Sequence, residues 1–303
     1  MDTNFGLIGT ITHDRISFES GNVFEGLGGI LYQVSILCGL KKRVVLYTNL
    51  GRELVPDVEK AIGNWCTLNR RGIREVPGPG NQVCLHYPKA GERIETLLSV
   101  VPPLQFSQFM KDLAELDVLI LVINSGFDIE LGDFRKSMNA VDCPVWLDVH
   151  SLPLEKKLNC PRHYHSLPEW KDWAAGVSYL QANKKEVAAM RSLPFSEPTE
   201  NEMRNFAQSA IDLGVKGVFI TLGKEGVLVV SPEKAEKISV IEKKGLVDTT
   251  GCGDIFCAGS VVQIVSGNNV FEAASFGLEL AADAVCIQGI DEAYDLASRK
   301  SVK

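Results

Sequence analysis

The chain has 303 residues, of which 45% are hydrophobic and 23% charged, so it buries a large core and is not disordered as a whole. Its 31 Lys and Arg stand against 38 Asp and Glu, which gives a formal net charge of −7. This charge, without a block of basic residues, argues against nucleic acid as the main partner, although backbone dipoles can still bind a phosphorylated small molecule.

Apolar strands and helical apolar patterns alternate along the chain. Up to residue 64 we expect, in chain order, a strand at Phe5–Gly9, a helix at Gly29–Leu40, a strand at Val44–Thr48 and a helix at Val55–Asn64. Beyond residue 100 the order is helix Phe106–Leu116, strand Val118–Ile123, helix Leu131–Ala140, strand Val145–Asp148, strand Gly176–Ala182, helix Lys184–Met190, helix Asn201–Leu213, strands Val218–Leu222 and Val227–Val230, and helices Gly253–Val265 and Val270–Ile287.

Two segments interrupt this alternation. Gly21–Phe24 has the texture of a hairpin, and residues 72–100 place the short β-like runs Gln82–Tyr87 and Glu95–Val100 after a Pro- and Gly-rich turn. We expect both segments, near residues 15–25 and 72–100, to form a small β-lid. Since continuous apolar strands between helices indicate a parallel sheet covered on both faces, the predicted fold is a three-layer α/β sandwich, with residues 1–303 as one domain.

The chain shows no sign of a membrane or secretory segment. No apolar run approaches the roughly 20 residues that a spanning helix needs. We also see no basic stretch followed by an apolar stretch, which is the pattern typical of a signal peptide. The eight Cys are scattered and form no C-x-x-C pair, as is usual for reduced intracellular proteins. We therefore expect a cytoplasmic protein with no membrane partner.

The most informative stretch lies near the C-terminus. Gly251 and Gly253 flank Cys252, and Asp254 follows at the start of an apolar helix. Glycines and a helix N-terminus can turn backbone N–H groups toward one anion. An acid at the mouth of such an anion hole would repel the anion, so Asp254 is better suited to take a proton from an attacking hydroxyl. The alternative is a Gly-rich turn in which Asp254 caps the helix.

The segment Asp248–Asp254, with the sequence Asp-Thr-Thr-Gly-Cys-Gly-Asp, resembles the C-terminal signature of the ribokinase/PfkB family of sugar kinases, Asp-Thr-x-Gly-Ala-Gly-Asp. The departure is Cys252 in place of Ala, and Cys contributes its backbone N–H equally well. The resemblance implies a ribokinase-like fold and transfer of phosphate from ATP to a hydroxyl of a sugar-like molecule. The N–H groups of Gly251, Cys252 and Gly253 would then stabilise the transferring phosphoryl group.

Further family motifs occur in the same order as in the family. Asn183-Lys-Lys-Glu186 resembles Asn-x-x-Glu, in which Asn183 would bind phosphate and Glu186 would hold water on Mg²⁺. The stretch from Thr221 to Gly226, including Gly223, resembles the nucleotide loop Thr-Leu-Gly-x-x-Gly. Each motif has a structural alternative, since the first also suits a helix cap with a helix glutamate and the second a hairpin turn.

The acceptor end departs more from the family. Gly9 and Asp14 match Gly-x-x-x-x-Asp, whose acid binds sugar hydroxyls, and Gly28 with Gly29 would open the first helix. Gln33 stands where the family usually has Asn. Asn124 stands at a strand end where some members contact the sugar, and Asp148-Val-His150 replaces the common Asp-x-Asn. The sequence therefore supports the reaction type better than the substrate.

Three further expectations concern a monovalent cation, the assembly of the protein and the alternatives to a sugar kinase. Some relatives bind K⁺ beside the segment Asp248–Asp254, which we call the phosphoryl loop. In this chain that would place a monovalent cation near Asp248 and Thr250. Relatives often pair their lids, so we expect a homodimer through the lid. One rival is a nucleoside kinase with an aromatic clamp from Phe24, Tyr32 and Phe127; the other is a catalytically silent ligand-binding member of the family.

Overall fold

The computed structural model describes residues 3–89, 93–193, 196–241, 243, 247 and 249–301. Its main sheet has nine strands, and the neighbouring strands from β5 to β11 are all parallel. In spatial order these are β13 (Ala235–Ile238), β12 (Val227–Val230), β11 (Gly217–Thr221), β10 (Tyr179–Asn183), β9 (Val145–Asp148), β8 (Val118–Val122), β1 (Asn4–Ile8), β4 (Arg43–Gly51) and β5 (Leu68–Val76). The strands β12 and β13 complete one edge as an antiparallel pair.

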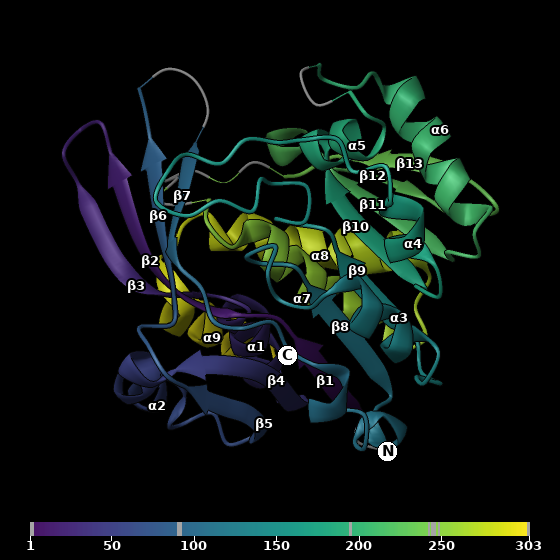
Figure 1. Ribbon diagram of the computed structural model, residues 1–303. Helices are drawn as coiled ribbons and strands as arrows, with labels where there is room; N and C mark the ends of the chain where they lie inside the picture. Colours follow the sequence, from purple (N-terminus) through teal and green to yellow (C-terminus); the bar gives the residue numbers. More distant parts are fainter. Residues whose placement is uncertain are drawn as a thin grey trace.

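Helices cover both faces of this sheet (Figure 1). One core joins the sheet to α1 (Leu31–Gly39), α2 (Val55–Ile62), α7 (Cys252–Val265), α8 (Val270–Ala284) and α9 (Gly289–Lys300). The other core joins it to α3 (Leu131–Met138), α4 (Trp170–Ala174), α5 (Lys184–Met190) and α6 (Glu200–Ile211). The three-layer α/β sandwich predicted from the alternating pattern is confirmed, and no helix in the described ranges is long and apolar enough to cross a membrane.

A second sheet of four strands forms the lid. Its order is β3 (Val23–Gly29), β2 (Ile11–Phe18), β6 (Asn81–Tyr87) and β7 (Ile94–Ser99). The lid has a small apolar core of its own, which contains Ile16, Val83, Leu85 and Leu97. The strands that form it come from the two segments that the sequence analysis placed outside the main alternation, and Figure 1 shows them projecting from the main sheet.

Residues 151–166, which we call the strap, tie the lid to the body of the protein. The backbone N–H of Asn159 donates to the carbonyl of Leu97 at 2.8 Å, and that of Arg162 donates to the carbonyl of Glu95 at 2.9 Å. The Arg162 guanidinium also donates to Glu95 Oε1 at 2.8 Å and to the Ser125 carbonyl at 2.9 Å. The lid strand β7 is therefore bonded to the strap through both main chain and side chain.

Two predictions about local structure are wrong. The segment 106–116 contains two short 3₁₀ turns, Phe106–Gln108 and Leu113–Glu115, instead of a helix. Tertiary bonds compete with helix formation there, because Gln108 binds the backbone N–H of Gln105 at 2.5 Å and Asn49 Oδ1 at 3.1 Å. Residues 72–76 belong to β5 of the main sheet, not to the lid; as an edge strand it is half exposed and carries no continuous apolar run.

Several elements lay outside the sequence-based expectations. The sequence analysis missed α4, β13 and α9, which are short or strongly polar, and it did not recognise the full length of β2 and β3. The first helix begins at Leu31, so Gly28 and Gly29 end strand β3 and do not themselves open the helix.

Candidate active site

A cavity of about 570 Å³ lies where three parallel strands end and two helices begin. Asp148, Asn183 and Thr221 are the last residues of β9, β10 and β11, and all three line it. Ligands of open α/β sheets bind at this carboxyl edge, where helix N-termini also point. The predicted residues that line the cavity are Asn183, Glu186, Thr221, Gly223, Gly226, Gly251, Cys252, Gly253 and Asp254.

The backbone before α7 turns through a left-handed residue. Gly251 has φ 79° and is the N-cap of the helix, and a Cβ there would come within 2.6 Å of the Tyr32 ring. Gly253 already lies in the helix, and a Cβ there would be 3.8 Å from Gln181 Nε2. The backbone conformation therefore requires glycine at Gly251. At Gly253, which lines the cavity, a Cβ would make only an ordinary contact. The first N–H groups of a helix have no partner within the helix, so the N-terminus of α7 can bind an anion in the cavity, and the N–H of Cys252 also donates to the carbonyl of Thr249 at 3.3 Å.

Asp254 is a buried acid in the first turn of α7. The residue is 7% exposed, and its Oδ1 accepts a hydrogen bond of 2.5 Å from Nε2 of the fully buried Gln33 in α1. Burial raises the pKa of Asp254 to about 7, with a further contribution from the charge of Asp14, although the Gln33 bond acts in the opposite direction. The helix N-cap is Gly251, and no described side chain caps α7, so Asp254 does not serve as the cap. A carboxylate with a pKa near 7 is well matched to general-base catalysis at neutral pH.

Two more buried acids face the same cavity. Burial raises the pKa of Glu186 to about 8, and burial together with the charges of Glu186 and Asp254 raises the pKa of Asp148. Gln181 of β10 donates to Asp148 Oδ2 at 2.9 Å and to the Gly253 carbonyl at 3.0 Å, so it links the acid at the end of β9 to the phosphoryl loop. Carboxylates held in this way are poised to share a cation or a proton.

Asn183 and Glu186 form a capping box at the start of α5. The Asn183 side chain accepts from the N–H groups of Lys185 at 2.9 Å and Glu186 at 3.0 Å, and Glu186 Oε2 accepts from the Asn183 N–H at 2.7 Å. The Asn183 amide also donates to Glu186 Oε1. The local geometry is thus the helix cap weighed in the sequence analysis, and the same two residues line the cavity.

The stretch from Thr221 to Gly226 is the turn between the antiparallel strands β11 and β12. Gly223 and Gly226 have φ of 59° and 102°, and a Cβ at Gly226 would overlap the carbonyl of Ile238 in β13. The hairpin alternative therefore describes its backbone. Because Thr221, Gly223 and Gly226 also line the cavity, the turn is placed to contact a ligand.

The predicted acceptor residues do not line this cavity, although one of them, Gln33, contacts Asp254. Asp14 of β2 lies over Gly28 of β3, and a Cβ at Gly28 would overlap Asp14 Oδ2. Both side-chain polar atoms of Asn124 and the Oε1 atom of Gln33 are buried and have no hydrogen-bond partner within the described part of the chain. Since an unsatisfied buried polar group is costly, these atoms fit a ligand that carries hydroxyl groups.

The structure adds site residues that sequence reasoning missed. Arg93, just before β7, lines the cavity from the lid. The hydroxyl of Tyr87, at the end of β6, lies 3.2 Å from Thr250 Oγ1, so the lid touches the phosphoryl loop. No local sequence signal marks either residue, because each meets its partners across the fold. Asp248 of the predicted monovalent-cation site lies outside the described residues.

The aromatic clamp expected for a nucleoside kinase does not assemble as proposed. Tyr32 packs beneath Gly251 as part of the main core. Phe24 makes an edge contact with Phe18 at 6.1 Å, and the Phe127 ring lies beneath the Lys156 ammonium at 5.4 Å. Tyr32 therefore supports the phosphoryl loop and is not positioned for stacking on a base.

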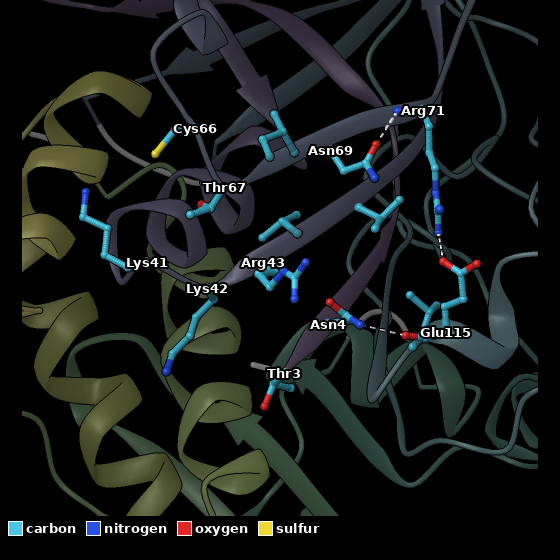
Figure 2. Close-up of a pocket in the computed structure, with 14 residues that line it drawn as sticks. Thr3, Asn4, Lys41, Lys42, Arg43, Cys66, Thr67, Asn69, Arg71 and Glu115 are labelled. Atoms are coloured by element: carbon cyan, nitrogen blue, oxygen red, sulfur yellow. Dashed lines mark hydrogen bonds and ion pairs between the residues drawn. The ribbon is translucent and has the colours of Figure 1, made fainter. Parts of the chain in front are cut away.

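A second hollow, of about 810 Å³, lies at the opposite end of the strands (Figure 2). It is lined by the starts of β1, β4 and β5 and by basic residues such as Lys41, Lys42 and Arg71. Arg71 donates to Glu115 at 2.6 Å, and the Lys41 ammonium lies 5.5 Å from the centre of the Tyr294 ring. None of the predicted site residues lines this hollow, so the candidate chemistry belongs to the first cavity.

Known proteins of the same fold align with nearly the whole chain. A ribokinase structure from Giardia lamblia has a TM-score of 0.79 at 14% identity and covers 99% of this chain and 98% of its own. A ribokinase structure from Thermotoga maritima has a TM-score of 0.75 at 21% identity, with 100% and 99% covered. A nucleoside kinase structure from Burkholderia thailandensis, in complex with inosine, has a TM-score of 0.75 at 16% identity, with 99% and 97% covered. These likenesses define the class: a ribokinase-like α/β fold.

Sequence comparison narrows the class to a family. Residues 156–294 match the model of the pfkB family of carbohydrate kinases. A ribokinase of Arabidopsis thaliana is 32% identical over 127 residues, which are 42% of this chain and 32% of that protein; an ATP-dependent 6-phosphofructokinase of Thermoanaerobacterium thermosaccharolyticum is 28% identical over 127 residues, 40% and 38%. The matches thus span about a third of the length of these curated relatives. Residues 156–294 are therefore similar in sequence to the pfkB family of carbohydrate kinases, and nearly the whole chain is similar in fold to ribokinase, as its motifs predicted.

Proposed function

We propose that the protein transfers the γ-phosphoryl group of ATP to a hydroxyl group of a sugar or sugar-like small molecule. The observation that carries this proposal is Asp254: a buried carboxylate with a pKa raised to about 7, mainly by burial, at the positive end of α7 and at the wall of the cavity. Such an acid between an anion hole and a polar pocket suits proton abstraction from an alcohol. The names of the relatives, ribokinase and 6-phosphofructokinase, support the same reaction class.

In this mechanism each part of the cavity has a separate task. Asp254 accepts the proton of the acceptor hydroxyl as its oxygen attacks phosphorus, and ADP leaves. The N–H groups of Gly251, Cys252 and Gly253 stabilise the charge on the transferring phosphoryl group. The turn residues Thr221, Gly223 and Gly226 line the nucleotide.

The donor set on the phosphate side fits a magnesium ion. Glu186 and Asp148 are buried carboxylates whose pKa values are raised, above all by burial, and hard oxygen ligands are those that Mg²⁺ prefers. Within the described ranges no group of three or more His, Cys, Asp or Glu is arranged to hold a metal alone. We therefore assign Glu186 to contact Mg²⁺ through water and Asn183 to bind phosphate; when bound, the ion neutralises the phosphate charge.

The acceptor pocket is polar and selective. Asp14 would accept from two hydroxyls, and the unpartnered amide atoms of Gln33 and Asn124 would complete the contact. Leu31 and Tyr32 are buried in the core. The longer side chain of Gln33, where the family usually has Asn, predicts that ribose is a poor substrate.

A coupled ADP-release assay tests the proposal. Wild-type protein would be screened with ATP and Mg²⁺ against pentoses, hexoses, sugar phosphates, polyols and nucleosides. We expect acceptor-dependent ADP release that Asp254→Asn abolishes. Release only with nucleosides would favour the nucleoside-kinase alternative. Nucleotide binding without turnover on any acceptor would favour the silent binder and contradict the proposal.

We also infer that two copies associate through their lids. The edge strands β3 and β7 expose large apolar side chains, namely Val23, Phe24, Ile94 and Leu98. Exposed apolar groups gathered on sheet edges invite a partner, and a second copy offers the matching surface. Solution scattering at tens of micromolar should give the mass of a dimer; a monomeric mass would contradict this.

A location in the cytoplasm, a single domain over residues 1–303 and a K⁺ site near Thr250 stay predictions. The K⁺ site can be tested by comparing reaction rates in K⁺ and Na⁺ buffers.

A further inference from the structure

Asp128 is a buried acid that the proposed mechanism does not use. It lies in the loop after β8, four residues beyond Asn124, is 2% exposed and does not line the cavity. Its Oδ1 accepts a hydrogen bond from the backbone N–H of Thr10 at 3.0 Å. Its Oδ2 accepts from the N–H and the hydroxyl of Ser125, both at 2.9 Å, and from the N–H of Gly126 at 3.1 Å. The carboxylate thus joins the loop after β8 to the turn after β1.

The bond to Thr10 reaches two other segments of the acceptor pocket. The carbonyl of Thr10 accepts from the N–H of Ile30 at 3.0 Å, and Ile30 directly precedes α1. Strand β2 begins at the residue after Thr10 and carries Asp14, whereas α1 carries Gln33. A shift of Thr10 would therefore move both of these predicted acceptor residues.

The side chain of Asn124 depends on the same arrangement. It lies against Gly9, the residue before Thr10, since a Cβ at Gly9 would come within 2.6 Å of Asn124 Oδ1. Neither polar atom of this amide has a hydrogen-bond partner within the described ranges, so no bond of its own fixes the amide there. Its position follows from the backbone on either side, and Asp128 binds the N–H of the next residue, Ser125.

The loop also has anchors that do not depend on the Asp128 side chain. The N–H of Leu104 donates to the carbonyl of Asp128 at 2.8 Å, and the Arg162 guanidinium donates to the carbonyl of Ser125 at 2.9 Å. These bonds hold the main chain of the loop to the body and to the strap. Loss of the carboxylate should therefore shift the loop and the turn after β1 relative to each other without unfolding them.

We propose that Asp128 is a positioning residue, which holds Asn124, Asp14 and Gln33 in the arrangement that binds the hydroxyl groups of the acceptor. An ionised carboxylate suits this task because it accepts with both oxygens, so the N–H groups of two separate turns can point at it. Sites built to hydrogen-bond hydroxyl groups tolerate small displacements badly, because a misplaced partner leaves buried polar atoms unpaired. Asp128 itself takes no part in bond making. The proposal rests on the kinase function proposed above.

The test uses Asp128→Asn, in which an NH₂ group replaces one of the two oxygens. Whichever way the amide lies, its NH₂ group faces N–H donors, either that of Thr10 or those of Ser125 and Gly126, so one of the two connections breaks. With the acceptor found in the ADP-release screen, we expect the KM for the acceptor to rise at least ~10-fold. The KM for ATP should change by less than ~2-fold, because the residues that line the cavity keep their bonds.

Two further variants make the result specific. Ser137→Ala in α3 is the control, because it removes a buried hydrogen bond of 2.8 Å from a residue that does not line the cavity. It should lower the melting temperature and leave both KM values unchanged. Ser125→Ala removes one of the four bonds to Asp128, so it should raise the KM for the acceptor by about 3-fold, and it provides the test if Asp128→Asn does not fold.

The outcomes separate this proposal from the kinase proposal. Equal changes of the two KM values in Asp128→Asn would overturn the positioning role, and so would a fall in kcat with an unchanged KM for the acceptor. An active wild-type protein whose KM for the acceptor is unaltered in both Asp128→Asn and Ser125→Ala would refute the role of Asp128 alone. Wild-type protein that phosphorylates no acceptor would refute the kinase function and this role with it.

Discussion

Replacing Asp254 with Asn should stabilise the free protein while it removes the catalytic base. Burial raises the pKa of this carboxyl from 3.8 to about 7 in the folded protein. Folding therefore favours the protonated form, and the stability that protonation gives is complete below the unfolded-state pKa and is lost as the pH rises through about 7. At pH 8.5 the wild-type protein keeps the buried charge, whereas Asn carries none and its oxygen can still accept from Gln33.

The size of the effect follows from the pKa change. One pKa unit corresponds to about 1.4 kcal/mol, so the penalty of the buried charge is up to about 4 kcal/mol at pH 8.5 and less than about 2 kcal/mol at pH 5. We expect Asp254→Asn to raise the free energy of unfolding by up to these amounts. Loss of the base should lower kcat by at least ~10²-fold at the same time.

Urea unfolding of the ligand-free protein at both pH values measures the gain. Asp295→Asn is a suitable control, because Asp295 is exposed on α9 and lies away from the cavity. The control should change the free energy of unfolding by no more than ~0.5 kcal/mol. The reasoning is refuted if Asp254→Asn is no more stable than the wild type at pH 8.5, or if its gain is the same at both pH values.

Three further predictions concern the phosphoryl loop and the acceptor. With saturating substrates, kcat should fall ~10-fold per pH unit below about 7, because Asp254 must be ionised to accept a proton; a flat profile from pH 5.5 to 8 would contradict this. Gly251→Ala should cost about 1–2 kcal/mol in unfolding experiments and most of the activity, because its φ is 79° and a Cβ would meet Tyr32, whereas Gly253→Ala should keep the wild-type melting temperature. Asp14→Ala should raise KM and lower kcat for the acceptor and leave KM for ATP nearly unchanged; unaltered acceptor kinetics would remove Asp14 from the pocket.

The parts of the site that sequence reasoning identified are those written in one short segment. Gly251 to Asp254 and Asn183 to Glu186 carry their chemistry within a few residues, and the predicted alternation of strands and helices brings them to one edge of the sheet. The contact between Gln33 and Asp254 joins residues 221 positions apart. Sequence analysis placed Gln33 only through a family position, and it had no means of seeing that this amide holds the base.

The missed residues share a physical reason. Arg93 and Tyr87 are ordinary lid residues by sequence, and their role depends on how the lid packs over the loop before α7; the contact of Tyr87 with Thr250 spans 163 positions. The same applies to β5. As a half-exposed edge strand it lacks the continuous apolar run by which the central strands were recognised. Packing between distant segments decided each of these features, and no local pattern records it.

Two contacts between the lid and the body differ greatly in strength, and this difference decides which of them opens first. Separating the buried pair of Arg162 and Glu95, 2.8 Å apart, would leave an uncompensated charge and cost about 3–5 kcal/mol. Separating the Tyr87 hydroxyl from Thr250, 3.2 Å apart, costs only about 1 kcal/mol. The contact above the phosphoryl loop should therefore open before the contacts between residues 151–166 and β7, so that a product leaves on the side of Tyr87.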